Sequence, residues 1–366
     1  MTWIAIDGGA LRHNAAALSQ WMATNSPTPP TVIAVVKADA YGHGAAPTTR
    51  ILADAGVDFF AVTSTEEALE LRSAGIDSRL LVFAPPPMAE EAEALIDADV
   101  AVTVADASGL GIVLAAAERV GKPAAVHLKV DSGMGRLGFL PVDALDAAKQ
   151  VAAGSNTRLA GVYTHFGRSL EPDFTPTTRQ FALFQDVLAK MKAAGVDAGL
   201  RHAANSAAIL RDKSTWLDAV RAGTILYGQY PSASVPRELS LKNTWQLKTR
   251  VVSVRKVPAG TAVGYGAEFV TKRASTLAVL SIGYADGFTM APGSVTSGLR
   301  GLKALLRKPP TTVTVRGAKA TVVGRVAMQM CTIDVTDIAG VDVGDVVDVP
   351  CRRLAASSRI PRVYEG

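Results

Sequence analysis

The sequence predicts a (β/α)8 barrel followed by a mostly-β C-terminal domain. From residue 1 to about residue 235, short apolar runs typical of buried strands alternate with alanine-rich stretches of helical spacing. This alternation indicates a parallel sheet covered by helices. Beyond residue 235 the pattern changes to short β-rich runs separated by glycines. A chain of 366 residues is long enough to build a core in each of two domains.

The barrel is expected to occupy residues 1–235. Its strands are predicted at 31–36, 59–62, 80–83, 100–104, 125–130 and 159–163, and its helices at 47–55, 65–74, 88–98, 107–120 and 142–153. About eight such units fit into this length, which favours a closed barrel over the alternative, a doubly wound open sheet.

The C-terminal domain is expected to occupy residues 236–366, after a segment rich in proline and serine. Its strands are predicted at 249–257, 275–282, 311–315, 320–323, 332–335 and 343–349.

Bulk composition is that of an ordinary globular protein, with 48% hydrophobic residues. No apolar run approaches the ~18 to 20 residues that a membrane span needs, and the first residues lack the basic and apolar regions of a signal peptide. We therefore expect a cytoplasmic protein that does not bind membranes. In that compartment Cys331 and Cys351 are expected to remain free thiols.

The chain has a formal net charge of +5, and the excess of basic over acidic residues is concentrated between residues 241 and 319. A basic region of this kind can bind nucleic acid, but these basic residues are spread among strand-like segments without a Lys/Arg-rich run. A solvated basic face is the better interpretation, and no nucleic-acid partner is expected.

Lys37 is the most informative single residue. It follows the apolar run 31–36, so it should lie where a buried strand gives way to a loop. A lysine at the carboxyl end of a barrel strand is well placed to bond covalently to a cofactor aldehyde. Tyr41, four residues later in a glycine-rich turn, can offer its hydroxyl to a phosphate.

The segment VVKADAYGHG that contains Lys37 is followed by further motifs in a fixed order. They are KVDSGMGRLG at 129–138, YTHF at 163–166, HAANS at 202–206, VRAGTILYG at 220–228, VGYG at 263–266 and GRVAM at 324–328. One short motif is weak support, whereas an ordered set across the chain is strong. Together they resemble the alanine racemases.

The resemblance implies that Lys37 binds pyridoxal phosphate and that no metal takes part. It further implies a two-base interconversion of L- and D-alanine, in which Lys37 serves the D face of the substrate and Tyr265 the L face. A hydrogen-bonded chain would run from Tyr265 through His165 to Arg221 and the pyridine nitrogen. Because a guanidinium does not give up its proton, Arg221 would leave that nitrogen unprotonated and restrain side reactions such as transamination.

The phosphate group would be bound by Tyr41, by Ser206 and by the backbone of Gly223 and Thr224, because backbone donors in glycine-containing loops hold phosphate well.

The remaining implied contacts concern the substrate and the partner subunit. Arg136 would contact both the cofactor and the substrate carboxylate. Lys129 matches a lysine that is carbamylated in related enzymes, and a simple ion-pairing lysine is an equal alternative. Tyr265 and Met328 would reach the active site of the other subunit, so a homodimer is expected. Its D-alanine would feed peptidoglycan synthesis.

Two departures from the family pattern leave the substrate open. Gln329 stands where a carboxylate is usual, and residues 350–364 lack the helical insertion whose tyrosine narrows the substrate entrance. A wider entrance would admit side chains larger than methyl, such as those of serine or lysine, so a racemase of another amino acid is an alternative. A decarboxylase is disfavoured by Arg221, and a non-catalytic cofactor-binding protein by the β domain and Tyr265.

Overall fold

The computed structural model describes residues 1–290 and 311–366, and the chain forms two compact units. One unit is Gly8–Thr244, and the other combines Met1–Asp7 with Trp245–Gly366. This division differs from the expected boundary at residue 235. The first seven residues join the C-terminal unit because strand β1 (Trp3–Asp7) pairs with strands of that unit. Pairing of this kind depends on residues far away in sequence, which a local pattern does not reveal.

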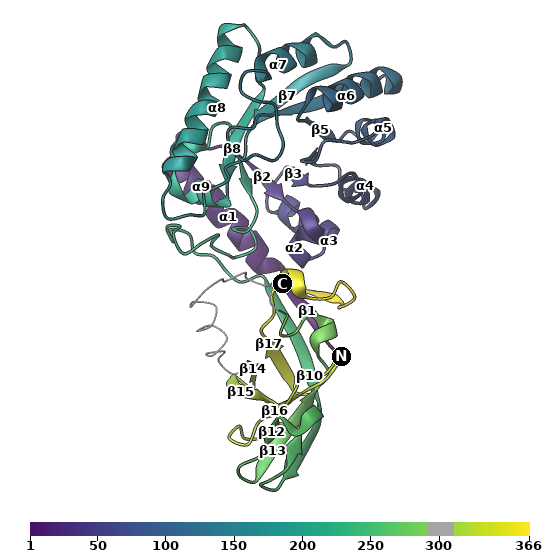
Figure 1. Ribbon diagram of the computed structural model, residues 1–366, viewed down its shortest axis with the longest axis vertical. Helices are drawn as coiled ribbons and strands as arrows, with labels where there is room; N and C mark the ends of the chain where they lie inside the picture. The colour runs from purple at the N-terminus through teal and green to yellow at the C-terminus, as the bar shows by residue number, and fades with distance from the viewer. Residues whose placement is uncertain (291–310) are drawn as a thin grey trace. The chain divides into compact units, whose positions relative to one another are not determined.

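The unit Gly8–Thr244 contains a closed barrel of eight parallel strands in sequential order, which confirms the predicted barrel and excludes the open sheet. Figure 1 shows helices α4 to α7 following one another around the outside of the strands. The strands are β2 (Thr31–Val35), β3 (Phe59–Val62), β4 (Arg79–Val82), β5 (Ala101–Val104), β6 (Ala124–Lys129), β7 (Thr157–Tyr163), β8 (Leu200–Asn205) and β9 (Ala219–Ala222). The helices are α1 (Gly8–Asn25), α2 (Lys37–Gly42), α3 (Ala45–Asp54), α4 (Thr65–Ser73), α5 (Ala89–Asp97), α6 (Ala107–Val120), α7 (Ala144–Ala153), α8 (Thr175–Ala193), α9 (Ser206–Arg211) and the 3-10 turn η1 (Lys213–Thr215).

Local sequence signals explain where several barrel helices begin and end. Ser64 and Glu67 form a capping box at the start of α4. Asp106 caps α6 by accepting a hydrogen bond from a backbone amide, and Gly121 ends it in a left-handed conformation. Asn205 caps α9 directly after β8. The three N-terminal caps, Ser64, Asp106 and Asn205, fix the loops at the carboxyl ends of the strands. Barrel active sites are found at this end.

The second unit is mostly β, as the sequence predicts, and most of its strands pair antiparallel. Its main sheet has the strand order β13-β16-β15-β14-β17-β10-β1-β18, and an additional β10–β13 pairing joins two strands within this run. The strands are β10 (Trp245–Val257), β11 (Ala262–Val263), β12 (Phe269–Val270), β13 (Ser275–Leu280), β14 (Thr312–Val315), β15 (Ala318–Val323), β16 (Cys331–Asp334), β17 (Val346–Val349) and β18 (Arg362–Glu365), with 3-10 turns η2 (Tyr265–Ala267), η3 (Tyr284–Asp286) and η4 (Arg353–Ala355).

The connection from β17 to β18 is short. It contains only the turn η4, in agreement with the shortened C-terminus seen in the sequence. The thiols of Cys331, which is buried, and Cys351, which is half-buried, are both free. Within residues 1–290 and 311–366, no helix combines the length and the apolar character needed to cross a membrane.

Candidate active site

A cavity of about 570 Å³ opens at the carboxyl end of the barrel strands. Every barrel residue that the sequence singles out for chemistry lines it: Lys37, Tyr41, Lys129, Arg136, His165, Ser206, Arg221, Gly223 and Thr224. These residues come from five separate motifs. The fold therefore brings them together in one cavity, as the sequence predicts.

Lys37 lies two residues beyond the end of β2 and begins an unusual turn. Residues Ala38, Asp39, Ala40 and Tyr41 all have left-handed backbone angles, with φ between 51° and 55°. For residues with a Cβ this conformation costs roughly 1–2 kcal/mol each. Such strain persists only where surrounding contacts enforce it, and it clusters at functional sites.

Several hydrogen bonds hold this turn in place. The amide of Ala40 donates to Val36 O at 2.8 Å, and that of Gly44 donates to Asp39 O at 3.0 Å. The carboxylate of Asp39 accepts from the amide of Ala45 at 2.7 Å. The turn thereby fixes where Lys37 leaves the strand and where Tyr41 faces the cavity.

Glu67 is a site residue that the sequence analysis missed. Its Oε1 accepts from the amide of Ala38 at 2.5 Å, and its Oε2 accepts from the amide of Thr63 at 2.8 Å. One carboxylate therefore ties the Lys37 turn to the end of the neighbouring strand β3. Burial and the charge of Arg136 lower the pKa of Lys37, whereas the charge of Glu67 opposes this shift. The capping-box pattern could have located Glu67, but not its second role.

Four of the predicted phosphate-binding residues form a cradle. The amide of Gly223 donates to Ser206 Oγ at 2.9 Å. A Cβ on Gly223 would come within 2.6 Å of the Tyr41 hydroxyl, so only glycine leaves room there. The buried hydroxyl of Thr224 has no hydrogen-bond partner within the described residues. A buried polar atom without a partner is costly, and a phosphate oxygen would satisfy it. The residues present therefore fit a phosphate.

Arg221 is buried, with 3% exposure. Its Nη1 donates to His202 Nδ1 at 2.9 Å, and its Nη2 donates to the carbonyls of Thr164 and Ala203, both at 2.7 Å. Burial lowers the pKa of Arg221 to about 10, so it stays charged at neutral pH. No hydrogen bond engages its Nε–H among the residues that the structure describes, so this donor is available to a group bound in the cavity.

His165 also contacts Arg221, as the sequence predicts. The guanidinium Nη2 donates to His165 Nδ1 at 3.4 Å. Burial and the charges of Arg221, Lys129 and Arg136 lower the pKa of His165 to about 3, so the ring is neutral. Because its Nδ1 accepts, its proton lies on Nε2. This nitrogen can donate to an oxygen atom, which suits a phenolic partner.

Three neutral histidines make stability depend on pH. Burial, followed by nearby arginines, lowers the pKa of His127 and of His165 to about 3 and that of His202 well below its usual 6.5. Between pH 6.5 and 3 the unfolded chain therefore binds more protons than the folded one, so stability falls as the pH falls. Each histidine adds a slope of about 1.4 kcal/mol per pH unit.

Urea unfolding between pH 4 and 6 measures this slope. A His127→Gln variant will show a slope smaller by about one such increment. An unchanged slope would mean that His127 is protonated in the folded protein.

The loop that carries Arg136 is organised by Asp131, another residue that the sequence analysis missed. One carboxylate oxygen of Asp131 accepts from the amides of Gly133, Met134 and Gly135 at 2.8–3.1 Å. Burial raises the pKa of Asp131, but the backbone amides outweigh it and hold the pKa below its usual value. Such a nest of amides around an anion fixes the loop. Arg136 itself is exposed to the cavity.

Lys129 is a buried amine at the end of β6. Burial, followed by the charges of Arg136 and Arg221, lowers its pKa to about 8. Its Nζ lies 5.7 Å from the centre of the Tyr163 ring. A fraction of this amine is therefore neutral near neutral pH.

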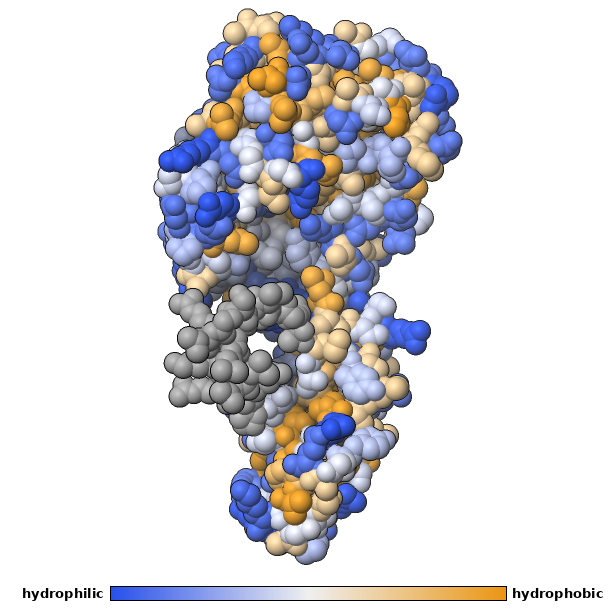
Figure 2. All heavy atoms as spheres, in the orientation of Figure 1, coloured by the Kyte–Doolittle hydropathy of each residue, from blue (hydrophilic) through white to orange (hydrophobic). Residues whose placement is uncertain are grey.

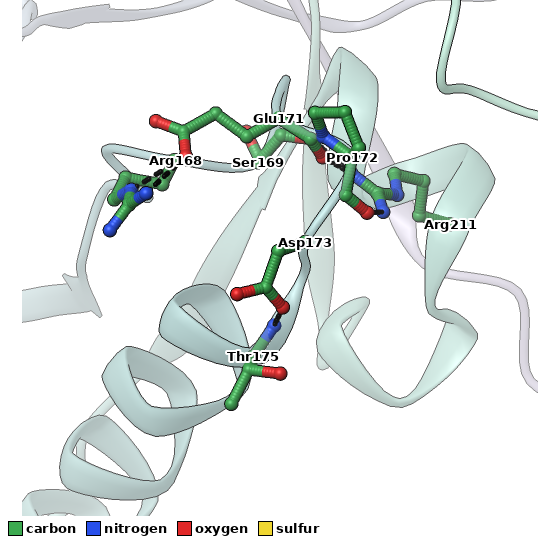
Figure 3. Close-up of polar contacts among 7 residues, drawn as sticks. All are labelled: Arg168, Ser169, Glu171, Pro172, Asp173, Thr175 and Arg211. Atoms are coloured by element: carbon green, nitrogen blue, oxygen red, sulfur yellow. Dashed lines mark hydrogen bonds and ion pairs between the residues drawn. The ribbon is translucent and has the colours of Figure 1, made fainter.

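The rim of the cavity is held by Arg211 at the end of α9. Figure 3 shows its guanidinium pointing at the loop between β7 and α8, where it donates to the carbonyls of Ser169 at 3.1 Å and Pro172 at 2.8 Å. Farther along the loop, Asp173 accepts from the amide of Thr175 at 2.9 Å and starts α8. Because Ser169 lines the cavity, this clamp fixes one wall of it.

Tyr265 and Met328 belong to the other unit and are not among the residues that line this cavity. Their side chains are 70% and 57% exposed. Their two loops are adjacent, since Arg325 Nε donates to Glu268 at 2.9 Å and Gly324 packs against Val263. Figure 2 shows hydrophobic residues at the surface of this unit.

The cavity fits one class of protein: a parallel barrel whose lysine and phosphate cradle suit a phosphorylated ring cofactor. Comparison with known proteins specifies it further. The chain belongs to the alanine racemase family, because residues 6–231 match the family model described as "Alanine racemase, N-terminal domain" and residues 244–360 match "Alanine racemase, C-terminal domain". This family depends on pyridoxal phosphate.

Similar proteins extend over nearly the whole chain. An alanine racemase of Methanococcus maripaludis is 40% identical over 95% of this chain and 88% of its own length. One of Desulforamulus reducens is 37% identical over 100% and 99%. Among solved structures, an alanine racemase of Clostridium difficile 630 has a TM-score of 0.89 at 30% identity, covering 100% of this chain and 95% of its own.

Proposed function

We propose that this protein is an alanine racemase that interconverts L- and D-alanine. The observation that carries the proposal is the single cavity in which Lys37, a phosphate cradle and the buried Arg221 face one another. The family supports the choice of substrate, since a related structure is described with cycloserine and another with bound L-Ala-P. The chain's own residues supply the anchoring amine and the donors that pyridoxal phosphate requires.

The cofactor would be held by Lys37 through its aldehyde, by the cradle of Tyr41, Ser206, Gly223 and Thr224 through its phosphate, and by Arg221 Nε through its ring nitrogen. When bound, it supplies an electron sink that makes the Cα proton of an amino acid removable.

Two groups must then handle protons on opposite faces of the substrate. Lys37 is proposed to serve the D face. Its lowered pKa increases the fraction of neutral amine that can accept a proton. Tyr265 is proposed to serve the L face, where the Nε2–H of His165 would stabilise its phenolate by donating a hydrogen bond.

Arg136 is proposed to bind the substrate carboxylate, because its guanidinium faces the cavity from a loop that Asp131 makes rigid. Met328 would offer its backbone amide to the same carboxylate from the partner subunit.

The proposal requires a homodimer in which Tyr265 of one subunit completes the barrel site of the other. The exposure of Tyr265 and Met328 and the surface hydrophobic residues around them suit an interface.

Mixing two inactive variants tests the shared site. In a heterodimer of Lys37→Ala and Tyr265→Phe subunits, one barrel receives both intact groups. Random mixing will restore about a quarter of wild-type activity. If Tyr265 served its own subunit, every site would lack one base and no activity would return.

Lys129 is proposed to be carbamylated, with its neutral amine adding CO2 and releasing one proton. The negative charge would pair with Arg136 and hold it toward the substrate. A carbamate signal from protein equilibrated with ¹³C-labelled CO2, absent in Lys129→Gln, tests this. Its absence from both proteins leaves the simple ion-pairing lysine as the correct assignment.

A Tyr265→Phe variant tests the two-base assignment. We expect it to bind the cofactor normally and to racemise alanine about 10²- to 10⁴-fold more slowly, since a proton-transfer group of this kind contributes that much. Cofactor absorbance and circular dichroism of alanine solutions provide the two measurements. Turnover unchanged in both directions would rule out Tyr265 as a base.

A second candidate function is a broader amino-acid racemase. The short β17–β18 connection favours it, because no helix there is available to narrow the entrance. Racemisation rates for alanine, serine, lysine and arginine decide between the two, and strict preference for alanine would exclude the broader range. We also propose that the reaction takes place in the cytoplasm, which cell fractionation would test. Its D-alanine would supply cell-wall synthesis.

A further inference from the structure

A second cavity lies at the opposite end of the barrel from the candidate active site. It encloses about 210 Å³ and is bordered by residues at the amino ends of strands β3 to β8. Its walls include apolar side chains such as Phe59, Leu80 and Leu200, and its polar lining includes His127, Arg79 and Arg158. None of these residues lines the active-site cavity.

His127 is the deepest polar group of this cavity, with 2% exposure. Its Nδ1 lies 3.0 Å from His202 Nε2, and His202 Nδ1 accepts from Arg221. Because a guanidinium only donates, the neutral His202 must carry its proton on Nε2 and give it to His127 Nδ1. The neutral His127 then carries its own proton on Nε2.

This arrangement leaves the Nε2–H of His127 as a donor for the cavity. No protein acceptor engages it among the described residues. The Nδ1–Cε1 edge of the ring lies against Gly161, where a Cβ would come within 2.6 Å of both atoms. Gly161 and His202 therefore fix the ring of His127 at its Nδ1 side, and its Nε2–H is engaged by neither.

Two guanidinium groups accompany this donor. Arg158 and Arg79 line the same cavity as His127, and their charges contribute to its lowered pKa. Arg79 is already engaged, since it pairs with Asp58 at 2.8 Å and stacks on Phe59 at 4.7 Å. Arg158 forms no ion pair or hydrogen bond within the described residues and is free to bind an anion.

We propose that this amino-terminal cavity binds a short-chain carboxylate. The carboxylate would accept from His127 Nε2–H and from the guanidinium of Arg158, while its hydrocarbon tail contacts Leu80 and Leu200. A charge-assisted pair of this kind is stronger than a neutral hydrogen bond.

The size and lining of the cavity favour a carboxylate over phosphate. The volume equals that of about seven liquid waters, which accommodates several heavy atoms. Apolar walls suit a tail, which inorganic phosphate lacks. Asp99 also borders the cavity and would repel a doubly charged anion more strongly than a singly charged one.

Histidine signals report occupancy directly, because the chain has only five histidines. In protein labelled with ¹⁵N-histidine, signals of His127 and His165 are assigned from His127→Gln and His165→Gln variants. Titration with butyrate will shift the His127 signal saturably, with a Kd in the millimolar range. The matched control Arg179→Gln, on the surface of α8, will behave like wild type.

An Arg158→Gln variant will bind butyrate at least tenfold more weakly and keep wild-type racemisation. The proposal is overturned if His127 does not respond, if only the active-site His165 responds, or if Arg158→Gln binds equally well. Tighter binding of inorganic phosphate than of butyrate would overturn the assignment of a carboxylate. Each of these results is independent of whether the protein racemises alanine.

Discussion

A Lys37→Ala variant will lose racemisation below detection and will release pyridoxal phosphate on gel filtration, while wild type retains it. The reason is that Lys37 offers an amine at the carboxyl end of β2, inside the cavity, where the aldehyde must be held. Lys129, the other cavity lysine, leaves the barrel from β6 and cannot reproduce this anchor. Cofactor absorbance after gel filtration and the rate of D-alanine formation are the measurements.

Two controls separate this chemical loss from misfolding. Lys122→Ala removes a surface lysine that pairs with Asp97 at 2.8 Å and should change neither property. Lys37→Arg retains the positive charge but cannot bond covalently to the aldehyde, so it should fail like Lys37→Ala with unchanged stability. A Lys37→Ala protein that keeps its cofactor through gel filtration would remove Lys37 from the proposed role.

The position of Lys37 could be predicted because it depends on a local pattern. An apolar, β-branched run of six residues predicts a strand, and the observed strand ends at Val35, one residue before the end of the run. The same reasoning located α6 at residues 107–120 and six strands of the C-terminal unit to within a few residues, but it missed β1, β11, β12 and β18. These elements owe their limits to caps and glycines nearby in sequence.

The surroundings of Lys37 could not be predicted in this way. Four consecutive left-handed residues are unfavourable for Ala38 to Tyr41, so propensity argues against them. They are stabilised by Glu67, which lies 29 residues away and whose sequence shows only a helix cap. Glu67→Gln would remove the charge, so the pKa of Lys37 would fall further, and its single amide oxygen could replace only one of the two accepting carboxylate oxygens.

The pairing of the N-terminal strand is another contact that the local sequence does not predict. Residues Trp3–Asp7 precede the barrel in sequence but pair with β10 and β18 of the other unit. In the sequence, His202 is recognisable only as part of the motif at 202–206. In the structure it joins Arg221 to His127 through hydrogen bonds. In each case the decisive contact lies far along the chain, so only the folded structure identifies it.

The second large effect is expected at Arg221, where stability and reaction specificity change together. An Arg221→Lys variant keeps one positive charge, but its ammonium has three donors on a flexible stem. The carbonyls of Thr164 and Ala203 and the Nδ1 of His202 will not all keep their donors. Each buried acceptor left without a donor costs about 1–3 kcal/mol, so the free energy of unfolding should fall by at least ~1 kcal/mol.

The reaction specificity should change because a lysine at this position gives up its proton more readily than Arg221 does. Arg221 keeps its proton at neutral pH, with a pKa of about 10 despite burial. A buried lysine has a strongly lowered pKa and can transfer its proton to a ring nitrogen. A protonated ring is a stronger electron sink, so the variant should release more keto acid per racemisation event than wild type. Counting keto acid against D-alanine, alongside urea unfolding, measures both effects. A variant that is destabilised but keeps the wild-type ratio would assign Arg221 a purely structural role.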